Sequence, residues 1–262
     1  MYTVKNERIG EENYNTYGTL MRIVEYYNKE NIIVEFQDEY RIKVSAKYIN
    51  FKKGKIKNPY DKSIYNIGYI GVGEFEIYNG NKHTEVYKVW HDLIKRCYEP
   101  YFINKNLTYK DCIICEEWHC FQNFAEWYYK NYYECNNETM ELDKDILFKN
   151  NKIYSPKTCI FVPHRINSLF VKCNKVRGEY PIGVSYSKRD NILTAQCNIL
   201  DENRRRKNIH LGEFPLNKPF QAFTAYKNFK ENYIKQVADE YKELIPIKLY
   251  EALYKYEVEI ND

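Results

Sequence analysis

The chain has 262 residues, a formal charge of +4 at neutral pH and 44% apolar residues, enough for the cores of one to three domains. It contains no run of 18 apolar residues, and its first residues, MYTVKNERIG, lack the apolar core of a signal peptide, so we expect a cytoplasmic protein with no membrane partner. Eight cysteines spread through so long a chain are typical of reduced thiols rather than a secreted disulfide framework.

Positive charge is concentrated in one part of the chain. Residues 172–207 carry nine Lys or Arg against four Asp or Glu, a net charge of +5, so the rest of the chain is close to neutral. A local basic surface of this kind favours binding to a polyanion, most simply a nucleic acid.

Residues 17–60 alternate between apolar and polar side chains in short bursts, LMRIVEY, NIIVEFQ and YRIKVSA. This period of two, with β-branched residues, predicts three or four strands of a small sheet or barrel that ends at Gly54, Asn58 and Pro59. The connector that follows contains Gly71 and Gly73, but no helix or Gly/Lys pattern follows at the spacing that a phosphate-binding loop requires.

Two aromatic helices are predicted in the middle of the chain, at residues 87–96 and 117–129, and we expect their aromatic stripes to form a core. Cys112 and Cys115 form a C-x-x-C with His119 and Cys120 downstream. The second half of a zinc site is missing, and His119 and Cys120 are adjacent on the expected helix, where they point about 100° apart. We therefore expect buried cysteines rather than zinc.

The last part of the chain predicts three strands, YPIGVSYSK, ILTAQCNIL and NIHLGEF, and then a long amphipathic helix that ends at Pro246. A short helix and a strand are expected to close the chain. Together these elements predict an α+β fold with a small N-terminal sheet or barrel, a central region with aromatic helices, and a C-terminal three-stranded sheet plus helix.

The segment ELDKDILFKNNKIYSPKTCIFVPHRINSLF, residues 141–170, has an acidic residue on one expected strand and an Asn on a following helix. It resembles the HNH nuclease family, which has a ββα-metal fold. In this resemblance Asp143 corresponds to the metal-binding Asp, Thr158 to the Asn that opens the second strand, and Asn167 to the metal ligand on the helix. The implied cofactor is Mg²⁺ or Mn²⁺ held by Asp143 and Asn167, because a hard cation needs only one or two protein oxygens beside water and phosphate.

The segment departs from the family at Lys144, which stands where the family has its catalytic His. A Lys with a pKa near ~10.4 is protonated at neutral pH, so it can hold a phosphate but cannot accept a proton from water. The general base is then another side chain, either Tyr154 or His164, which shares a helix face with Asn167. The alternative is that the fold is retained but the site is catalytically inactive, so that the protein only binds DNA.

The C-terminal elements resemble an APETALA2-type DNA-binding module, through Gly183-Val184, TAQCNI, LGEF and the helical AFTAYK. Together with the central segment, nearly the whole chain resembles phage or prophage proteins of the HNH/APETALA2 homing-endonuclease type. This implies a small β domain at 1–62, an HNH-like domain at 63–175 and a DNA-binding domain at 176–262. It also implies double-stranded DNA as the partner, in the cytoplasm of a bacterial host.

We expect the polar side chains Thr194, Gln196 and Asn198 to face DNA, because their apolar neighbours on the same strand fit the helix side better. The expected DNA contacts are Arg177, Lys188, Arg189, Gln196, Arg204, Arg205 and Arg206. Three functions remain open: a metal-dependent DNA endonuclease, nicking or cutting both strands; a catalytically inactive DNA-binding regulator; and an interaction protein that counters a host defence.

Overall fold

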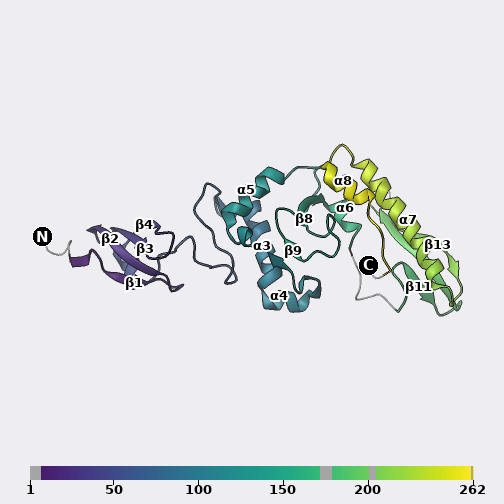
Figure 1. Cartoon of the computed structure of the whole chain (residues 1–262), viewed down its shortest axis with the longest axis horizontal. Helices are drawn as coiled ribbons and strands as arrows, with labels where there is room; N and C mark the ends of the chain where they lie inside the picture. Colours follow the sequence, from purple (N-terminus) through teal and green to yellow (C-terminus); the bar gives the residue numbers. More distant parts are fainter. Residues whose placement is uncertain (1–6, 172–178, 201–204, 261) are drawn as a thin grey trace. The chain divides into compact units, whose positions relative to one another are not determined.

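The computed structural model describes residues 7–171, 179–200, 205–260 and 262. Its secondary structure is mixed, with a four-stranded sheet near the N-terminus, helices in the middle and a three-stranded sheet in the C-terminal part (Figure 1). The chain divides into two compact units. Unit 1 is Met1–Tyr132 with Lys152–Lys157, and unit 2 is Tyr133–Asn151 with Thr158–Asp262. Both expected sheets are confirmed, whereas domain boundaries after residues 62 and 175 stay predictions.

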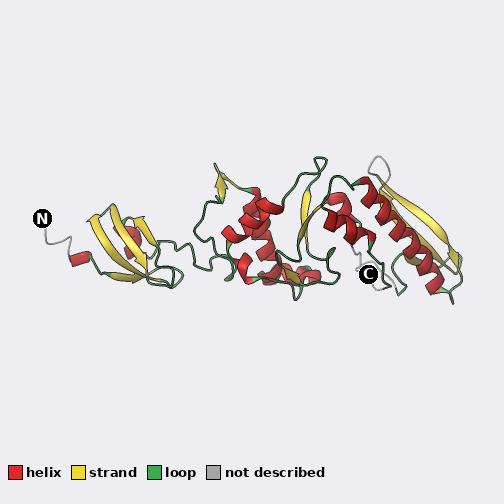
Figure 2. Ribbon diagram, turned by 45° about the horizontal axis from the view of Figure 1, so that its top comes forward, coloured by secondary structure: helices red, strands yellow, loops and turns green. Residues whose placement is uncertain are grey.

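The N-terminal sheet of unit 1 is antiparallel with the strand order β1-β2-β3-β4 (Figure 2). Apolar residues alternate along β2 and β3, which buries one face of the sheet against the short helix α2. The core residues of this face include Met21, Ile23, Val34 and Phe51. The elements are β1 (Glu12–Tyr14), β2 (Leu20–Asn28), β3 (Asn31–Phe36), β4 (Lys43–Ala46) and α2 (Tyr48–Lys52).

The rest of unit 1 is built around two helices, α3 (Glu85–Tyr98) and α5 (Phe121–Asn131), that contact each other. Trp90 is fully buried between them and its Nε1 donates a hydrogen bond to the carbonyl of Trp118 at 2.8 Å. The smaller elements are β5 (Tyr78–Asn79), β6 (Lys82–His83), α4 (Pro100–Lys105), η1 (Leu107–Tyr109), β7 (Ile113–Ile114), η2 (Glu116–His119) and β9 (Ile153–Tyr154).

The second aromatic helix begins later than the sequence predicts. Residues 116–119 form the 3₁₀ turn η2, and α5 begins only at Phe121. Cys120 is extended between them because it pairs with Tyr69: the Tyr69 amide donates to the His119 carbonyl, and the Phe121 amide donates to the Tyr69 carbonyl, each at 2.9 Å. This pairing with a residue 51 positions upstream could not be read from the local helical period.

Unit 2 begins with two antiparallel strands, β8 (Met140–Asp143) and β10 (Ile160–Pro163), and the helix α6 (His164–Ser168) follows β10 directly. The C-terminal sheet has the order β11-β12-β13, with β11 (Val184–Ser187), β12 (Ile192–Leu200) and β13 (Arg206–Phe214). The long helix α7 (Pro219–Glu240) runs along this sheet and contacts all three strands (Figure 2). The short helix α8 (Ile247–Tyr254) packs against α7.

Two details of this last segment differ from expectation. Helix α7 ends at Glu240 rather than near Pro246, and residues 241–245 turn instead, with the amides of Leu244 and Ile245 donating to the Tyr241 carbonyl. Pro246 precedes α8, a position that suits its fixed φ and missing N–H. The expected final strand is wrong for the described residues 255–260, which contain no strand.

One hydrophobic core joins the β8–β10–α6 element to the helices of the C-terminal module. Val162 and Ile166 are fully buried in the same cluster as Ile234 and Val237 of α7 and Leu249 of α8. Burial of each such side chain contributes roughly 1.5–3 kcal/mol to folding. The strands β8 and β10 with α6, and the long helix α7 of the C-terminal module, are therefore parts of one folded unit. No helix in the described part of the chain is both long and apolar enough to span a bilayer.

Candidate functional site

The β8–β10 hairpin and α6 bring together the polar residues of the motif. In the register of the hairpin Glu141 lies opposite Val162 and Asp143 lies opposite Ile160. Glu141 and Asp143 are two residues apart on one strand, so their side chains lie on the same face of the sheet. His164 and Asn167 are three residues apart on α6, which places them on one face of that helix.

The carboxylate of Glu141 contacts both α6 residues. Its Oε1 is 2.5 Å from Nδ1 of His164, and its Oε2 accepts a hydrogen bond from Nδ2 of Asn167. An ionised carboxylate can only accept hydrogen bonds, so Nδ1 of His164 carries the proton and Nε2 keeps its lone pair in the neutral ring. The same logic orients the amide of Asn167, whose Oδ1 is left to act as an acceptor or ligand.

Glu141 is a candidate site residue that sequence reasoning missed. Its spacing of two from Asp143 in a predicted strand was the available signal, since it places two carboxylates on one face. The partnership with α6 depends on how the helix packs against β8. The expectation that His164 and Asn167 share a helix face is confirmed by their common contact with Glu141.

Asp143 stands at the end of β8 and shapes the turn that follows. Its Oδ1 accepts hydrogen bonds from the backbone amides of Asp145 at 2.8 Å and Ile146 at 2.7 Å. Burial raises the pKa of Asp143 above its ordinary value, while the two amides act in the opposite direction. In the described residues Oδ2 makes no hydrogen bond, and the structure joins Asn167 to Glu141 rather than to Asp143.

Lys144 lies in the loop after β8, and its contacts disfavour the expected role of holding a phosphate. Only 7% of its side chain is exposed, and Nζ donates to Asp145 Oδ2 at 2.6 Å and to the Asn151 carbonyl at 2.8 Å. The side chain of Asn151 donates back to the Lys144 carbonyl at 3.0 Å. Because a phosphate contact would require the amine to leave these partners, we assign Lys144 a structural role in the loop after β8.

Tyr154 is a poor candidate for the general base. It belongs to β9 in unit 1, where only 3% of the residue is exposed. Burial raises the pKa of Tyr154 far above its ordinary value, with a smaller contribution from Tyr109. A phenol held neutral in this way does not accept a proton from water at physiological pH. Of the two base candidates from the sequence, His164 is the one whose side chain is exposed, by 66%.

The expected DNA contacts fall into two groups. Arg177 and Arg204 lie outside the described residues. The other five are on the C-terminal sheet or its turns, and all but the partly buried Gln196 are exposed. Nε2 of Gln196 donates to Ser185 Oγ at 3.4 Å. These five are Lys188, Arg189, Gln196, Arg205 and Arg206.

The two faces of β12 differ as the alternation predicts. Leu193, Ala195 and Cys197 are buried, and Cys197 packs in a cluster with Phe223 and Tyr226 of α7. The alternate residues Thr194, Gln196 and Asn198 are partly or fully exposed. The prediction that the apolar set faces the helix is confirmed. The sheet therefore presents hydroxyl and amide groups on the face away from α7, and its β11–β12 turn and β13 end carry exposed cations.

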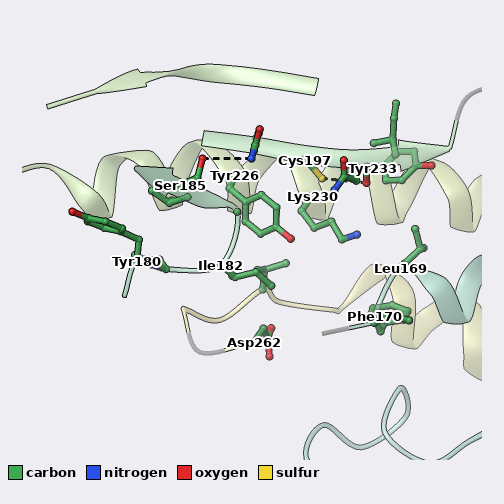
Figure 3. Close-up of a pocket in the computed structure, with 18 of the residues that line it drawn as sticks. Leu169, Phe170, Tyr180, Ile182, Ser185, Cys197, Tyr226, Lys230, Tyr233 and Asp262 are labelled. Carbon is green, nitrogen blue, oxygen red and sulfur yellow. Dashed lines mark hydrogen bonds between the residues drawn. The ribbon is translucent and has the colours of Figure 1, made fainter. Parts of the chain in front are cut away.

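A cavity of about 670 Å³ lies on the α7 side of this sheet, between β11, β12 and the C-terminal residues Tyr256, Val258 and Asp262. Figure 3 shows Tyr226 and Lys230 projecting from α7 into this space. Burial lowers the pKa of Lys230 below its ordinary value, and its amine has no hydrogen-bond or ion-pair partner in the described part of the chain. This side chain is therefore an unpaired cation in a largely apolar environment.

Within the described residues most of the cysteine thiols are buried. Cys112 is buried with its thiol directed at the Thr108 carbonyl, and burial raises the pKa of Cys115. Within residues 7–171, 179–200, 205–260 and 262, no group of three or more His, Cys, Asp or Glu side chains has a geometry that could hold a metal ion. Compared with family models, curated proteins and solved structures, the chain matches none. Its function is therefore inferred from the residues and their geometry.

Proposed function

We propose that this chain is a divalent-metal-dependent DNA endonuclease of the HNH, phage homing type, which binds duplex DNA through its C-terminal sheet. The observation that carries the proposal is the contact of Glu141 with both His164 and Asn167. It fixes a basic nitrogen and an amide oxygen at one place on an antiparallel hairpin followed by a helix. Two such oriented groups beside a second acidic residue, Asp143, support phosphodiester hydrolysis.

His164 acts as the general base in this proposal. Its Nδ1 is held by the Glu141 carboxylate, so Nε2 is the atom that accepts a proton from the attacking water. Orientation of a base by a carboxylate on its other ring nitrogen is a recurring arrangement in hydrolytic enzymes, because it selects the tautomer and favours the imidazolium that forms. The exposed position of His164 leaves this nitrogen accessible to a bound phosphodiester.

Asp143 and Asn167 are the residues that would hold a divalent cation. The donor set fits Mg²⁺ or Mn²⁺, because it offers a carboxylate oxygen, Oδ2, and an amide oxygen, Oδ1, without sulfur. A second reason is that Asp143 is a partly buried carboxylate whose hydrogen bonds come from backbone amides, while the neighbouring Lys144 pairs with Asp145. When bound, such a cation polarises the scissile phosphate and stabilises the leaving oxygen.

The sheet supplies DNA binding in this proposal. Hydroxyl and amide side chains on one strand can read base edges, and the exposed cations of the turns hold phosphates. If about four phosphates are neutralised, a plot of the logarithm of the binding constant against the logarithm of salt concentration should have a slope of about −3.6. A slope near zero would contradict the proposed role of Lys188, Arg189 and Arg206.

A second candidate function is that of a DNA-binding regulator without catalytic activity. A catalytically inactive protein of this kind could also counter a host defence. It is favoured by Lys144, which replaces the usual catalytic His of the HNH family and is buried in a loop. Binding through the sheet does not depend on that loop.

One experiment separates the two candidates. The full chain is incubated with supercoiled plasmid and with phage DNA, in Mg²⁺ or Mn²⁺ and in chelator. The matched control is Asp143→Asn, which keeps Oδ1 for the turn but removes the charge. An endonuclease nicks DNA only with metal and loses this activity in the variant, with DNA affinity retained. Binding without nicking under every condition would identify the regulator.

A further inference from the structure

We propose that Arg165 is a specificity-determining residue, because its ion pair with Glu240 fixes the position of the DNA cut at a constant distance from the bound sequence. This inference rests on the proposed endonuclease function. Arg165 lies on α6 between the two residues that contact Glu141, and Glu240 is the last residue of α7. Nη2 of Arg165 is 2.6 Å from Oε2 of Glu240.

The junction between α6 and α7 has further contacts around this ion pair. The guanidinium of Arg165 lies over the ring of Tyr241 at 5.6 Å, and the Arg165 amide donates to Glu138 Oε2 at 3.2 Å. The hydroxyl of Tyr241 donates to the other oxygen of Glu138. Only 19% of the Arg165 side chain is exposed, so solvent screens this pair less than an ordinary surface pair.

Apolar packing supports the same connection. Ile166 of α6 and Val237 of α7 are fully buried in one core, and α7 continues from there along the C-terminal sheet. Neither end of this connection is a flexible linker, so the candidate catalytic residues have few arrangements relative to the sheet, and the Arg165–Glu240 ion pair favours one of them. A packed core changes between discrete arrangements and does not bend continuously.

The geometry limits how far the cut can lie from the bound sequence. The sheet packs against α7 near Tyr226, whereas α6 is attached at Glu240, about 21 Å away along a helix that rises about 1.5 Å per residue. Duplex DNA rises about 3.4 Å per base pair. The cut should therefore lie within about six base pairs of the centre of the bound segment, always at the same offset.

The test compares where the protein binds with where it cuts. The duplexes are end-labelled and carry the region of a plasmid that the protein nicks. The bound segment is first mapped by hydroxyl-radical footprinting in chelator. The nicks are then mapped at nucleotide resolution on the same duplexes in Mg²⁺ or Mn²⁺. For the parent we expect a single offset between footprint and nick. When one to four base pairs are inserted between them, the nick should move to new bases and keep its offset.

Two variants address the ion pair itself. Glu240→Gln is remote in sequence from the candidate catalytic residues, and Arg165→Gln removes the other partner. Each should keep the footprint, spread the nicks over several neighbouring positions and slow single-turnover nicking by about tenfold to a hundredfold. Arg165→Lys retains the charge and should keep the parent offset. The control Lys255→Ala breaks an exposed pair with Glu251 and should change neither quantity.

The outcomes separate this inference from the proposed function. Nicking by the parent at variable distances from its footprint would overturn the inference and leave the endonuclease intact. An unchanged single nick position in Glu240→Gln and Arg165→Gln would do the same. Absence of nicking by the parent on plasmid and phage DNA with either metal would remove the proposed function and this inference together.

Discussion

Replacement of Glu141 by Gln tests whether this carboxylate orients the proposed catalytic residues. Gln is nearly isosteric but neutral, and its amide can present either a donor or an acceptor to each partner. It therefore no longer selects the Nδ1–H tautomer of His164 or the orientation of the Asn167 amide. We expect single-turnover nicking to fall by about 10²-fold or more, which corresponds to about 2.7 kcal/mol of transition-state stabilisation.

The expected effect of Glu141→Gln on stability is smaller. Glu141 is 35% exposed and His164 is 66% exposed, so solvent screens the pair and the two contacts together contribute about 1 kcal/mol to folding. The assay combines nicking of supercoiled plasmid by saturating protein with urea unfolding and DNA binding of the same samples. Glu126→Gln, which breaks an exposed pair with Lys130, is the matched control. A fall in rate of less than about threefold, with stability unchanged, would refute the orienting role.

Three further predictions concern single positions. Lys144→His should lower the free energy of unfolding, measured in urea titrations, by about 1–3 kcal/mol, because it removes the hydrogen bonds of Lys144 to Asp145 and Asn151. The substitution should not raise the nicking rate, because this position faces the loop after β8. A gain of nicking would contradict this prediction. Gly183→Ala should destabilise the folded chain by about 3 kcal/mol or more, since φ is +76° and a Cβ would lie 2.1 Å from the Tyr226 ring. The thermal unfolding midpoint is measured by far-UV circular dichroism. A midpoint unchanged within about 2 °C would show that the ring can move. Lys230→Met should stabilise by about 1–3 kcal/mol at pH 7, because it removes an unpaired, partly buried cation from the cavity beside α7. The lowered pKa means that the folded chain releases this proton before the unfolded chain does, so the gain should shrink as pH rises toward 10.5; a pH-independent gain in urea unfolding would argue against charge as the cause.

Local patterns in the sequence predict the elements whose burial is decided by their own neighbours. The alternation in ILTAQCNIL predicts β12 and assigns Leu193 and Ala195 to the helix side, because each strand face meets a different environment. The spacing of His164 and Asn167 predicts their common helix face for the same kind of reason. These inferences need no knowledge of distant contacts.

The differences arise where a distant partner decides the conformation. Cys120 leaves the expected helix because Tyr69 pairs with it, and Lys144 turns inward because Asn151 and Asp145 accept its amine. Glu141 becomes a candidate site residue only through the packing of α6 on β8. Neither the Cys120–Tyr69 pair nor the contact of Glu141 with α6 lies within a short window of sequence. Lys144 is only one and seven residues from its partners, but the loop that brings them together has no periodic pattern, so composition and periodicity could not reveal any of these contacts.

The division of the chain into units has a consequence for folding during synthesis. Residues 152–157 belong to unit 1, although they lie between the strands β8 and β10 of unit 2. As the chain leaves the ribosome, unit 1 therefore stays incomplete until Lys157 has emerged. At that point β8 has been synthesised, but its partner strand β10 has not. A cut at any single point between residues 133 and 157 leaves part of one unit on the wrong fragment. A fragment that begins at residue 172 would likewise lose Val162 and Ile166 and expose the face of α7 that they cover.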